Sequence, residues 1–155
     1  IIILKEYILT RTNSLLSKEY KVLKNILKNE GLRFTKQRQA IWDEIKGSKE
    51  HQDVDNIYFN LQKRGIAVSR ATVYRTLEVL VKNKLVGKMD VGDGRSRYEL
   101  KLNQKHHDHM ICLETGDIIE FYNQELEELQ EKIVTENGYE LVRHVHQLFV
   151  RPLKK

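Results

Sequence analysis

Residues 69–83 read SRATVYRTLEVLVKN, the pattern of an amphipathic helix with a basic outer face. Ser69 can accept a backbone N–H group as an N-cap, so the pattern predicts a helix over Arg70 to Asn83. At 100° per residue, one face of this helix is apolar and must pack on a small core. An ordinary amphipathic helix with a solvated basic face has the same pattern. The flanking segments must therefore distinguish such a surface helix from a DNA-recognition helix. The opposite face and its flank carry the side chains suited to base edges in the major groove of DNA: Thr72, Tyr74 and Arg75.

Three shorter helices are predicted before this one. The first covers residues 17–29. Thr35 is the expected N-cap of the second helix, which ends near Gly47, and Asp53 precedes the third, which ends near Gly65. Such a set of short helices with tight connections is typical of a small DNA-binding bundle.

A basic hairpin is predicted after the fourth helix. Residues 85–89 and 97–100 are strand-like runs on either side of Asp93-Gly94, which is a strong hairpin signal. Helices followed by such a hairpin give the order of a winged helix-turn-helix domain. The side chains expected to contact phosphates, which position the protein without reading sequence, are Arg33, Lys36, Arg38, Arg95 and Arg97.

The overall composition fits a soluble globular protein, because 40% of the 155 residues are hydrophobic and 32% are charged. Collagen-like, mucin-like and fully disordered classes are excluded. The apolar opening, residues 1–4, is too short to span a bilayer and does not resemble a signal peptide. We therefore expect a cytoplasmic protein with no membrane partner. Cys112 is the only cysteine, which excludes an internal disulfide and any zinc site that needs two cysteines.

Charge divides the chain into two parts. Residues 1–101 hold 21 lysines and arginines against 12 acidic residues, whereas residues 102–155 hold 6 against 10 and five of the six histidines. A basic part suggests a polyanionic partner, and an acidic, histidine-rich part suggests cations. The sequence predicts an α+β protein with an N-terminal winged helix-turn-helix DNA-binding domain (17–101), a hinge (102–105) and a small α/β dimerisation domain (106–155). Residues 1–16 are left as an N-terminal extension of unassigned order.

A histidine cluster opens the second part. His106 to Cys112 is predicted to be a strand that pairs with residues 118–121. Because alternate side chains of a strand leave opposite faces, His106 and Asp108 point one way, and His107 and His109 the other. Clustered imidazoles repel when protonated, so a neutral, metal-bound state is the simplest reason for them. Imidazole with carboxylate suits Fe(II), Mn(II), Zn(II) or Ni(II), and each face needs further ligands from elsewhere.

The end of the chain adds one helix and one strand. Asn123 is the expected cap of a helix to about residue 137, with Glu127 on a solvated acidic face. A last strand is predicted over residues 139–150, with His144 and His146 on one face. The apolar residues of the helix that are expected to point inward are Leu126, Leu129 and Ile133. A sheet of so few strands has an exposed edge and a thin core, so we expect a homodimer whose twofold symmetry suits palindromic DNA.

The motifs together resemble the ferric uptake regulator family. They are GLRFTKQR (31–38), ATVYRTL (71–77), GDGRSRYEL (92–100) and HHDHMIC (106–112), in the family's order. The resemblance implies a homodimeric bacterial transcriptional regulator and not an enzyme. It further implies repression of iron-uptake genes through an AT-rich palindromic operator when Fe(II) is bound, with Mn(II) or Zn(II) able to substitute.

The resemblance also implies two metal sites and a set of DNA contacts. Tyr74 and Arg75 would be the base-contacting pair, and Arg33 would take the place of a minor-groove lysine or arginine. The regulatory site linking the two domains would use His51, Glu99, His107, His109 and Glu120. The second site would use His106, Asp108, Glu127 and His144.

One family feature is missing. Many members hold structural zinc with Cys-x-x-Cys pairs, but here Cys112 is followed by Thr115 and the tail has no cysteine, so no four-cysteine zinc site is expected. Cys112 is instead expected to be a buried strand residue.

Three alternatives stay open. The first is a sister regulator that responds to manganese, or to zinc, nickel, peroxide or haem, because ligand types alone do not separate the metals. The second is a metallohydrolase, although no general base accompanies the cluster. The third is a winged-helix protein with structural histidines, whose DNA binding would not respond to chelators.

Overall fold

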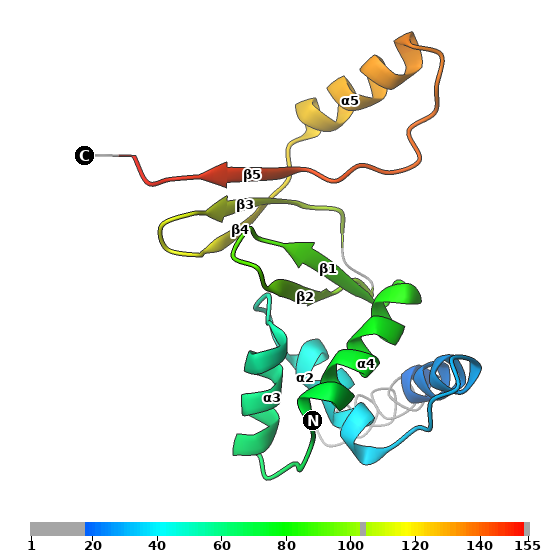
Figure 1. Cartoon of the computed structure of the whole chain (residues 1–155). Coiled ribbons are helices and arrows are strands. Elements are labelled where there is room, and N and C mark those ends of the chain that lie inside the picture. Colours follow the sequence, from blue (N-terminus) through cyan, green and yellow to red (C-terminus); the bar gives the residue numbers. More distant parts are fainter. Residues whose placement is uncertain (1–17, 103–104, 154–155) are drawn as a thin grey trace, which may run out of the picture. The chain divides into compact units, whose positions relative to one another are not determined.

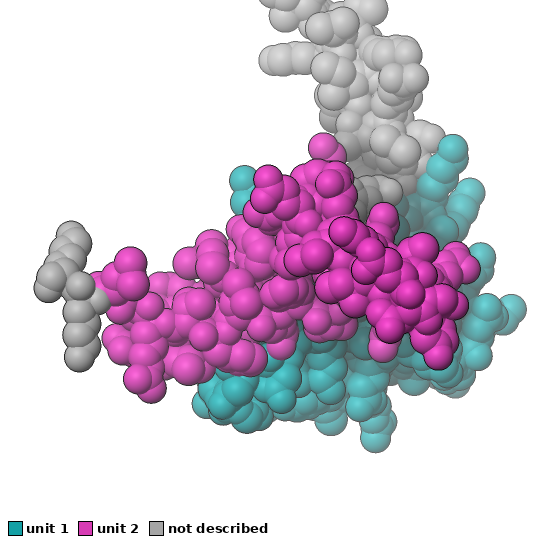
Figure 2. All heavy atoms as spheres, turned by 90° about the horizontal axis from the view of Figure 1, so that it is seen from above, with its two compact units in different colours: residues 1–102 teal, residues 103–155 magenta. Residues whose placement is uncertain are grey.

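The structure, a computed structural model, describes residues 18–102 and 105–153. The chain forms two compact units, residues 1–102 and residues 103–155, which Figure 2 distinguishes by colour. The N-terminal extension and residues 103 and 104 of the expected hinge lie outside the described residues. Among the described residues, no helix is long and apolar enough to cross a membrane.

The first unit begins with the predicted helices. Residues 18–29 form the first helix, followed by α2 (Lys36–Gly47), α3 (Val54–Lys63) and α4 (Arg70–Lys82). The side chains of Thr35, Asp53 and Ser69 accept backbone N–H groups at the starts of α2, α3 and α4, and the caps at Thr35 and Ser69 were predicted. At α3 the cap is a reciprocal capping box with Asn56. The largest fully buried apolar side chains of this unit are Leu23, Leu27, Ile41, Trp42, Ile57, Leu61, Leu77 and Leu80.

A two-stranded wing completes the first unit (Figure 1). Strands β1 (Val86–Asp90) and β2 (Ser96–Leu100) are antiparallel, and the predicted Asp93-Gly94 turn joins them. Gly94 has φ +77°, a conformation that a residue with a Cβ atom rarely adopts. A third segment, which the sequence analysis missed, pairs with β2 through two backbone hydrogen bonds between Gln52 and Tyr98, with N···O distances of 3.2 and 2.8 Å.

The second unit is a three-stranded sheet and one helix. The elements are β3 (Asp108–Cys112), β4 (Ile118–Phe121), α5 (Gln124–Glu136) and β5 (Gln147–Val150). The strand order is β4-β3-β5, with β4 antiparallel and β5 parallel to β3. Asn123 caps α5, and Cys112 is a buried strand residue, both as predicted.

Three predictions about this unit are wrong. The first strand begins at Asp108 and not at His106. The last strand begins at Gln147 and not at Tyr139, because β5 pairs only with the segment of β3 between His109 and Cys112. Residues 139–146, including His144 and His146, therefore precede the strand.

The third correction concerns α5. Its apolar side chains were expected to point inward, but Leu129 is 53% exposed and Ile133 is 51% exposed, and no residue of α5 is buried. The sheet has only three short strands, and α5 projects from one end of them in Figure 1. A single copy of this unit thus leaves the apolar face of α5 in water.

Candidate metal centres and DNA-binding surface

Four side chains of the second unit converge on one point. His106 precedes β3, Asp108 opens β3, Glu127 lies in the first turn of α5, and His144 lies in the segment before β5. One donor atom from each residue lies within 4.8 Å of the other three. Glu127 was expected on a solvated face, but its side chain is only 18% exposed and points into this cluster.

The distances within this cluster suit a metal ion. His106 Nε2 lies 3.5 Å from Asp108 Oδ1 and 3.3 Å from Glu127 Oε1. His144 Nε2 lies 3.4 Å from the same Asp108 oxygen, 3.7 Å from Glu127 Oε1 and 2.8 Å from His106 Nε2. Four ligands at about 2.0–2.2 Å from an ion in a tetrahedron lie about 3.3–3.6 Å apart. Three of the five distances lie in this range, the His144–Glu127 distance is slightly longer, and the two imidazole nitrogens at 2.8 Å would have to move apart around a tetrahedral ion.

The electrostatics of the cluster also favour a bound metal ion. Asp108 is buried, and its Oδ2 atom has no hydrogen-bond partner among the described residues. Glu127 Oε1 is also buried without a hydrogen bond in the described part of the chain. Two buried carboxylates beside two imidazoles need a positive charge, which a divalent cation supplies. Nitrogen and oxygen donors without thiolate fit Fe(II), Mn(II) or Zn(II).

A second group of ligands lies in the same unit. His109 and Glu120 are directly opposed on β3 and β4, and His107 Nε2 lies 3.7 Å from Glu120 Oε1. The ring centroids of His107 and His109 are 4.9 Å apart. His107 Nδ1 lies 3.0 Å from the carbonyl oxygen of Lys105; if Nδ1 carries the proton, Nε2 is left for a metal. The alternation expected from the sequence separates this group from the cluster of His106 and Asp108.

The first unit holds a further pair, His51 and Glu99. Because Gln52 pairs with Tyr98 in an antiparallel bridge, their neighbours His51 and Glu99 are brought together, with His51 Nε2 3.2 Å from Glu99 Oε2. The Nζ atom of Lys101 lies 2.7 Å from the other Glu99 oxygen. Gly87 is opposite Glu99 on β1, and a Cβ atom there would lie 2.9 Å from Glu99 Oε1. The residues that surround the pair thus leave room for the carboxylate.

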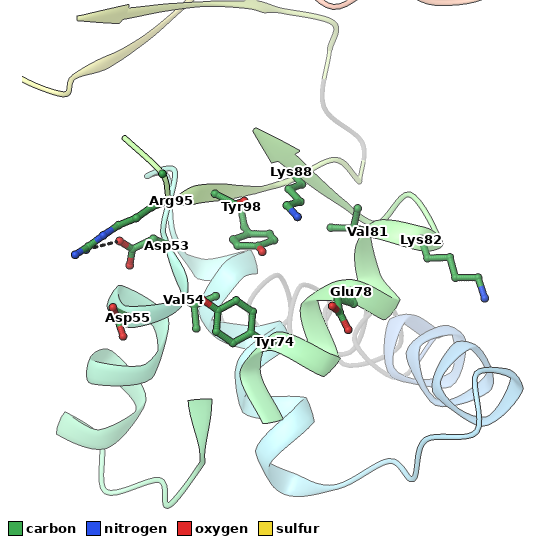
Figure 3. Close-up of a pocket in the computed structure, with 12 residues that line it drawn as sticks. Asp53, Val54, Asp55, Tyr74, Glu78, Val81, Lys82, Lys88, Arg95 and Tyr98 are labelled. Carbon is green, nitrogen blue, oxygen red and sulfur yellow. Dashed lines mark hydrogen bonds and ion pairs between the residues drawn. The ribbon is translucent and has the colours of Figure 1, made fainter. Parts of the chain in front are cut away.

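The exposed face of α4 lies beside a cavity of about 520 Å³ between α4, the start of α3 and the wing (Figure 3). Tyr74 is 51% exposed and lines this cavity, and Arg75 is exposed beside it. The hydroxyl of Thr72 lies 2.9 Å from that of Ser69, so it also supports the helix start. Burial raises the pKa of Tyr98 at the back of the cavity, so its phenol stays neutral.

The five expected phosphate contacts are not equivalent. Arg33 and Lys36 are exposed. Arg38 Nη1 donates to the carbonyl oxygen of Arg33 at 2.8 Å. Arg95 Nη1 donates to Asp53 Oδ2 at 3.3 Å, and Arg97 pairs with Asp93 across the wing turn. The wing arginines therefore already contact carboxylates that a DNA phosphate would have to replace.

Sequence reasoning missed the contact that fixes the start of α4. Arg70 Nε donates to Asp55 Oδ1 at 2.7 Å, which raises the pKa of Arg70. Its guanidinium carbon also lies 4.1 Å from the ring centroid of Tyr58. Fifteen residues separate Arg70 from Asp55, so no local pattern signals this link between α3 and α4.

Comparison with known proteins adds an independent observation. The Ferric uptake regulator family matches residues 29–149 of the chain. The chain belongs to the ferric uptake regulator family. It therefore consists of an N-terminal winged helix-turn-helix domain and a C-terminal dimerisation domain, as predicted. Members of this family are metal-binding transcription regulators.

Individual family members are similar to this chain over most of their length. A protein named ferric uptake regulation protein from Rhizobium leguminosarum bv. viciae is 41% identical over 135 residues, which cover 87% of this chain and 94% of that protein. The Helicobacter pylori ferric uptake regulator, described as having three functional metal binding sites, gives a TM-score of 0.79 at 29% identity and covers 90% of both chains. A zinc-bound manganese uptake regulator gives a TM-score of 0.64 at 40% identity, covering 84% of this chain and 98% of its own.

Proposed function

We propose that this family member is a dimeric Fe(II)-responsive repressor that binds an AT-rich palindromic operator of iron-uptake genes when it is metal-loaded. The observation that carries the proposal is the convergence of His106, Asp108, Glu127 and His144 at metal-ligand spacing in the same chain as α4. Metal and DNA are then the two ligands of one protein. Linkage requires that each raises the affinity for the other by the same factor.

The regulatory ion is proposed to join ligands of both domains. His107, His109 and Glu120 would provide one half of its coordination, and His51 with Glu99 the other half, with residues 102–105 as the hinge. The family resemblance supports this assignment, and so does the arrangement of each half by backbone pairing. A bound ion would fix the hinge, so that both recognition helices of a dimer face the same side of the duplex.

The second site would stabilise the dimerisation domain. It draws on β3, α5 and the segment before β5, so an ion there would hold three parts of this domain together. The apolar residues left exposed on α5 and β5, including Leu129, Ile133 and Phe149, are proposed to be covered by the second copy.

The DNA contacts follow the exposed face of the first unit. Tyr74 and Arg75, with Thr72 on the same helix face, would read bases in the major groove, and Arg33 would enter the minor groove. The side chains that would contact the backbone are Lys36, Arg38, Arg95 and Arg97. Arg95 and Arg97 would exchange their carboxylate partners for phosphates on binding.

The alternative metal is manganese. Nitrogen and oxygen ligands accept both Fe(II) and Mn(II), and one relative is named a manganese uptake regulator. The family relationship supports a metal-responsive regulator in either case.

The test is fluorescence anisotropy of an AT-rich palindromic duplex under anaerobic conditions. Metal-free protein is titrated with Fe(II), Mn(II) or Zn(II), with scrambled DNA as the control. We expect selective binding only when metal is present, and a lower threshold for Fe(II) than for Mn(II) at buffered free-metal concentrations. Selective binding that ignores metal and chelator would contradict the metal-responsive function. A lower threshold for Mn(II) would identify manganese, and not iron, as the metal to which the regulator responds.

A further inference from the structure

The exposed face of the first helix carries a row of lysines. They follow one another at intervals of three or four residues, so they occupy an arc of about 120° on the helix. We call this row the lysine stripe: Lys18, Lys21, Lys24 and Lys28. All four are exposed, whereas Leu23 and Leu27 on the other side of the helix are buried in the core.

The neighbouring acidic residues do not neutralise the lysine stripe. Glu19 forms an ion pair with Lys46 of α2. Glu30 accepts a 2.6 Å hydrogen bond from Lys82 of α4, which lowers the pKa of Glu30. Among residues 18–102 and 105–153, none of the four lysines has an ion-pair partner. Like charges at this spacing repel and weaken a helix, and a polyanion would relieve the repulsion.

The lysine stripe leads into the proposed DNA contacts. Lys24 and Lys28 line an open groove of about 590 Å³ together with Arg33 and Phe34. Gly31, with φ +72°, turns the chain between the helix and Arg33. The charged face of the first helix is therefore continuous with the residue assigned to the minor groove.

We propose that the lysine stripe binds the phosphate backbone of the DNA that flanks the operator. This inference rests on the proposed function and extends the bound DNA beyond the bases that α4 reads. From Lys18 to Lys28 the helix rises about 15 Å, the axial length of about four base pairs. Lysines are flexible point charges, so they suit a regular row of phosphates of any sequence.

The experiment compares two duplexes that share one operator. The Mn(II)-loaded full-length protein first selects the operator from a random-sequence pool. The operator is then made alone and with about ten extra base pairs, roughly one helical turn, of arbitrary sequence on each side. Affinity is measured by anisotropy over a series of salt concentrations for the wild type and for Lys24→Gln/Lys28→Gln. The matched control is Lys63→Gln/Lys132→Gln, which removes the same charge from two exposed lysines outside the lysine stripe.

We expect the flanks to raise the affinity of the wild type and of the control at least about tenfold at 0.1 M salt, and that of the stripe variant, which keeps Lys18 and Lys21, about threefold or less. If each substituted lysine of both protomers neutralises one phosphate, the log–log salt dependence becomes shallower by about 3.6. Glutamine keeps helix propensity, and an unchanged circular dichroism spectrum verifies the fold. Equal affinity of the wild type for both duplexes, or an equal loss in both variants, would overturn the inference and leave the proposed function intact. Failure to select any operator would count against the proposed function itself.

Discussion

Arg75 lies on the exposed face of α4 and forms no ion pair with another described residue. Arg70, five residues earlier on the same helix, is held by Asp55 and stacks on Tyr58. Two arginines of one helix thus have different roles, one available for a base edge and the other fixing the helix on α3. The two roles differ because of the positions of the residues in the helix, since both side chains are guanidinium groups.

Replacing Arg75 with alanine should remove base reading without changing the fold. A bidentate contact between arginine and guanine is worth about 1–3 kcal/mol, and a dimer makes it twice. We expect operator affinity to fall toward that of scrambled DNA, while dimer formation and metal uptake stay unchanged. Anisotropy with both duplexes measures the selectivity, and retained selectivity would contradict the assignment of α4 as the recognition helix.

A substitution at Asp53 should raise DNA affinity, whereas the substitution at Arg75 should lower it. It caps α3 and also holds Arg95 of the wing. Asparagine caps helices as well as aspartate does, so Asp53→Asn should keep the helix and release Arg95. We expect tighter DNA binding, with a salt dependence steeper by up to about 0.9 per protomer. Asp53→Asn combined with Arg95→Gln is the control, and an equal gain in that double variant would exclude Arg95 as the cause.

At the scale of elements, the sequence predicted what depends on neighbours along the chain. The N-caps Thr35 and Ser69 are local signals, and both were predicted correctly. The start of β5 depends on its parallel pairing with β3, in which Gln147 lies opposite His109, and the Gln52–Tyr98 bridge joins segments 46 residues apart. Periodicity carries no information about such pairings, so both were missed.

The candidate ligands also divide into those that a local pattern predicts and those that depend on distant parts of the chain. Strand alternation separates His106 and Asp108 from His107 and His109 without any knowledge of the fold. Glu127 could not be found by pattern alone, because an acidic residue on a helix is usually solvated. His51 and Glu99 were assigned only through the family resemblance, since their meeting depends on a backbone bridge that no spacing announces.

The apolar face of α5 is proposed to lie in the dimer interface. Ile133 is half exposed in the single chain and is proposed to be covered in the dimer. We expect Ile133→Glu to weaken dimer formation at least about tenfold, because a buried carboxylate without a partner is costly. Sedimentation at several protein concentrations measures the effect. Lys132→Glu, a neighbouring exposed position, is the control, and an unchanged dimer in Ile133→Glu would place the interface elsewhere.

At the scale of the whole molecule, metal should act on stability as well as on DNA binding. An ion that binds the folded cluster at 100 times its dissociation constant adds about 2.7 kcal/mol to the free energy of unfolding. We expect Zn(II) or Mn(II) to raise the melting temperature in calorimetry, and a chelator to reverse the change. In Asp108→Asn/His144→Ala the shift should be much smaller. An equal shift in that variant would show that the ion stabilises the protein from another site.

The two ligand groups should differ in their effect on DNA. We expect His107→Ala/His109→Ala to make DNA affinity independent of metal, because the proposed regulatory ion would lose two ligands. His106→Ala/Asp108→Asn should lower stability more than it lowers the response to metal. DNA titrations with and without metal on both variants test this, and equal effects would contradict the division between a regulatory and a stabilising site.

Gly87 has a consequence for inherited variation. A Cβ atom there would lie 2.7 Å from Lys101 Cε and 2.9 Å from Glu99 Oε1, both near the ends of flexible side chains. The fold would therefore tolerate an alanine, but the carboxylate beside His51 would have to move. A strain with Gly87→Ala should keep normal levels of the protein, but regulation of its target genes should respond to a different metal concentration. The mutation would lie on a strand that provides no proposed ligand, so a geneticist mapping such a strain would find a sensing defect 12 positions before the nearest one, Glu99.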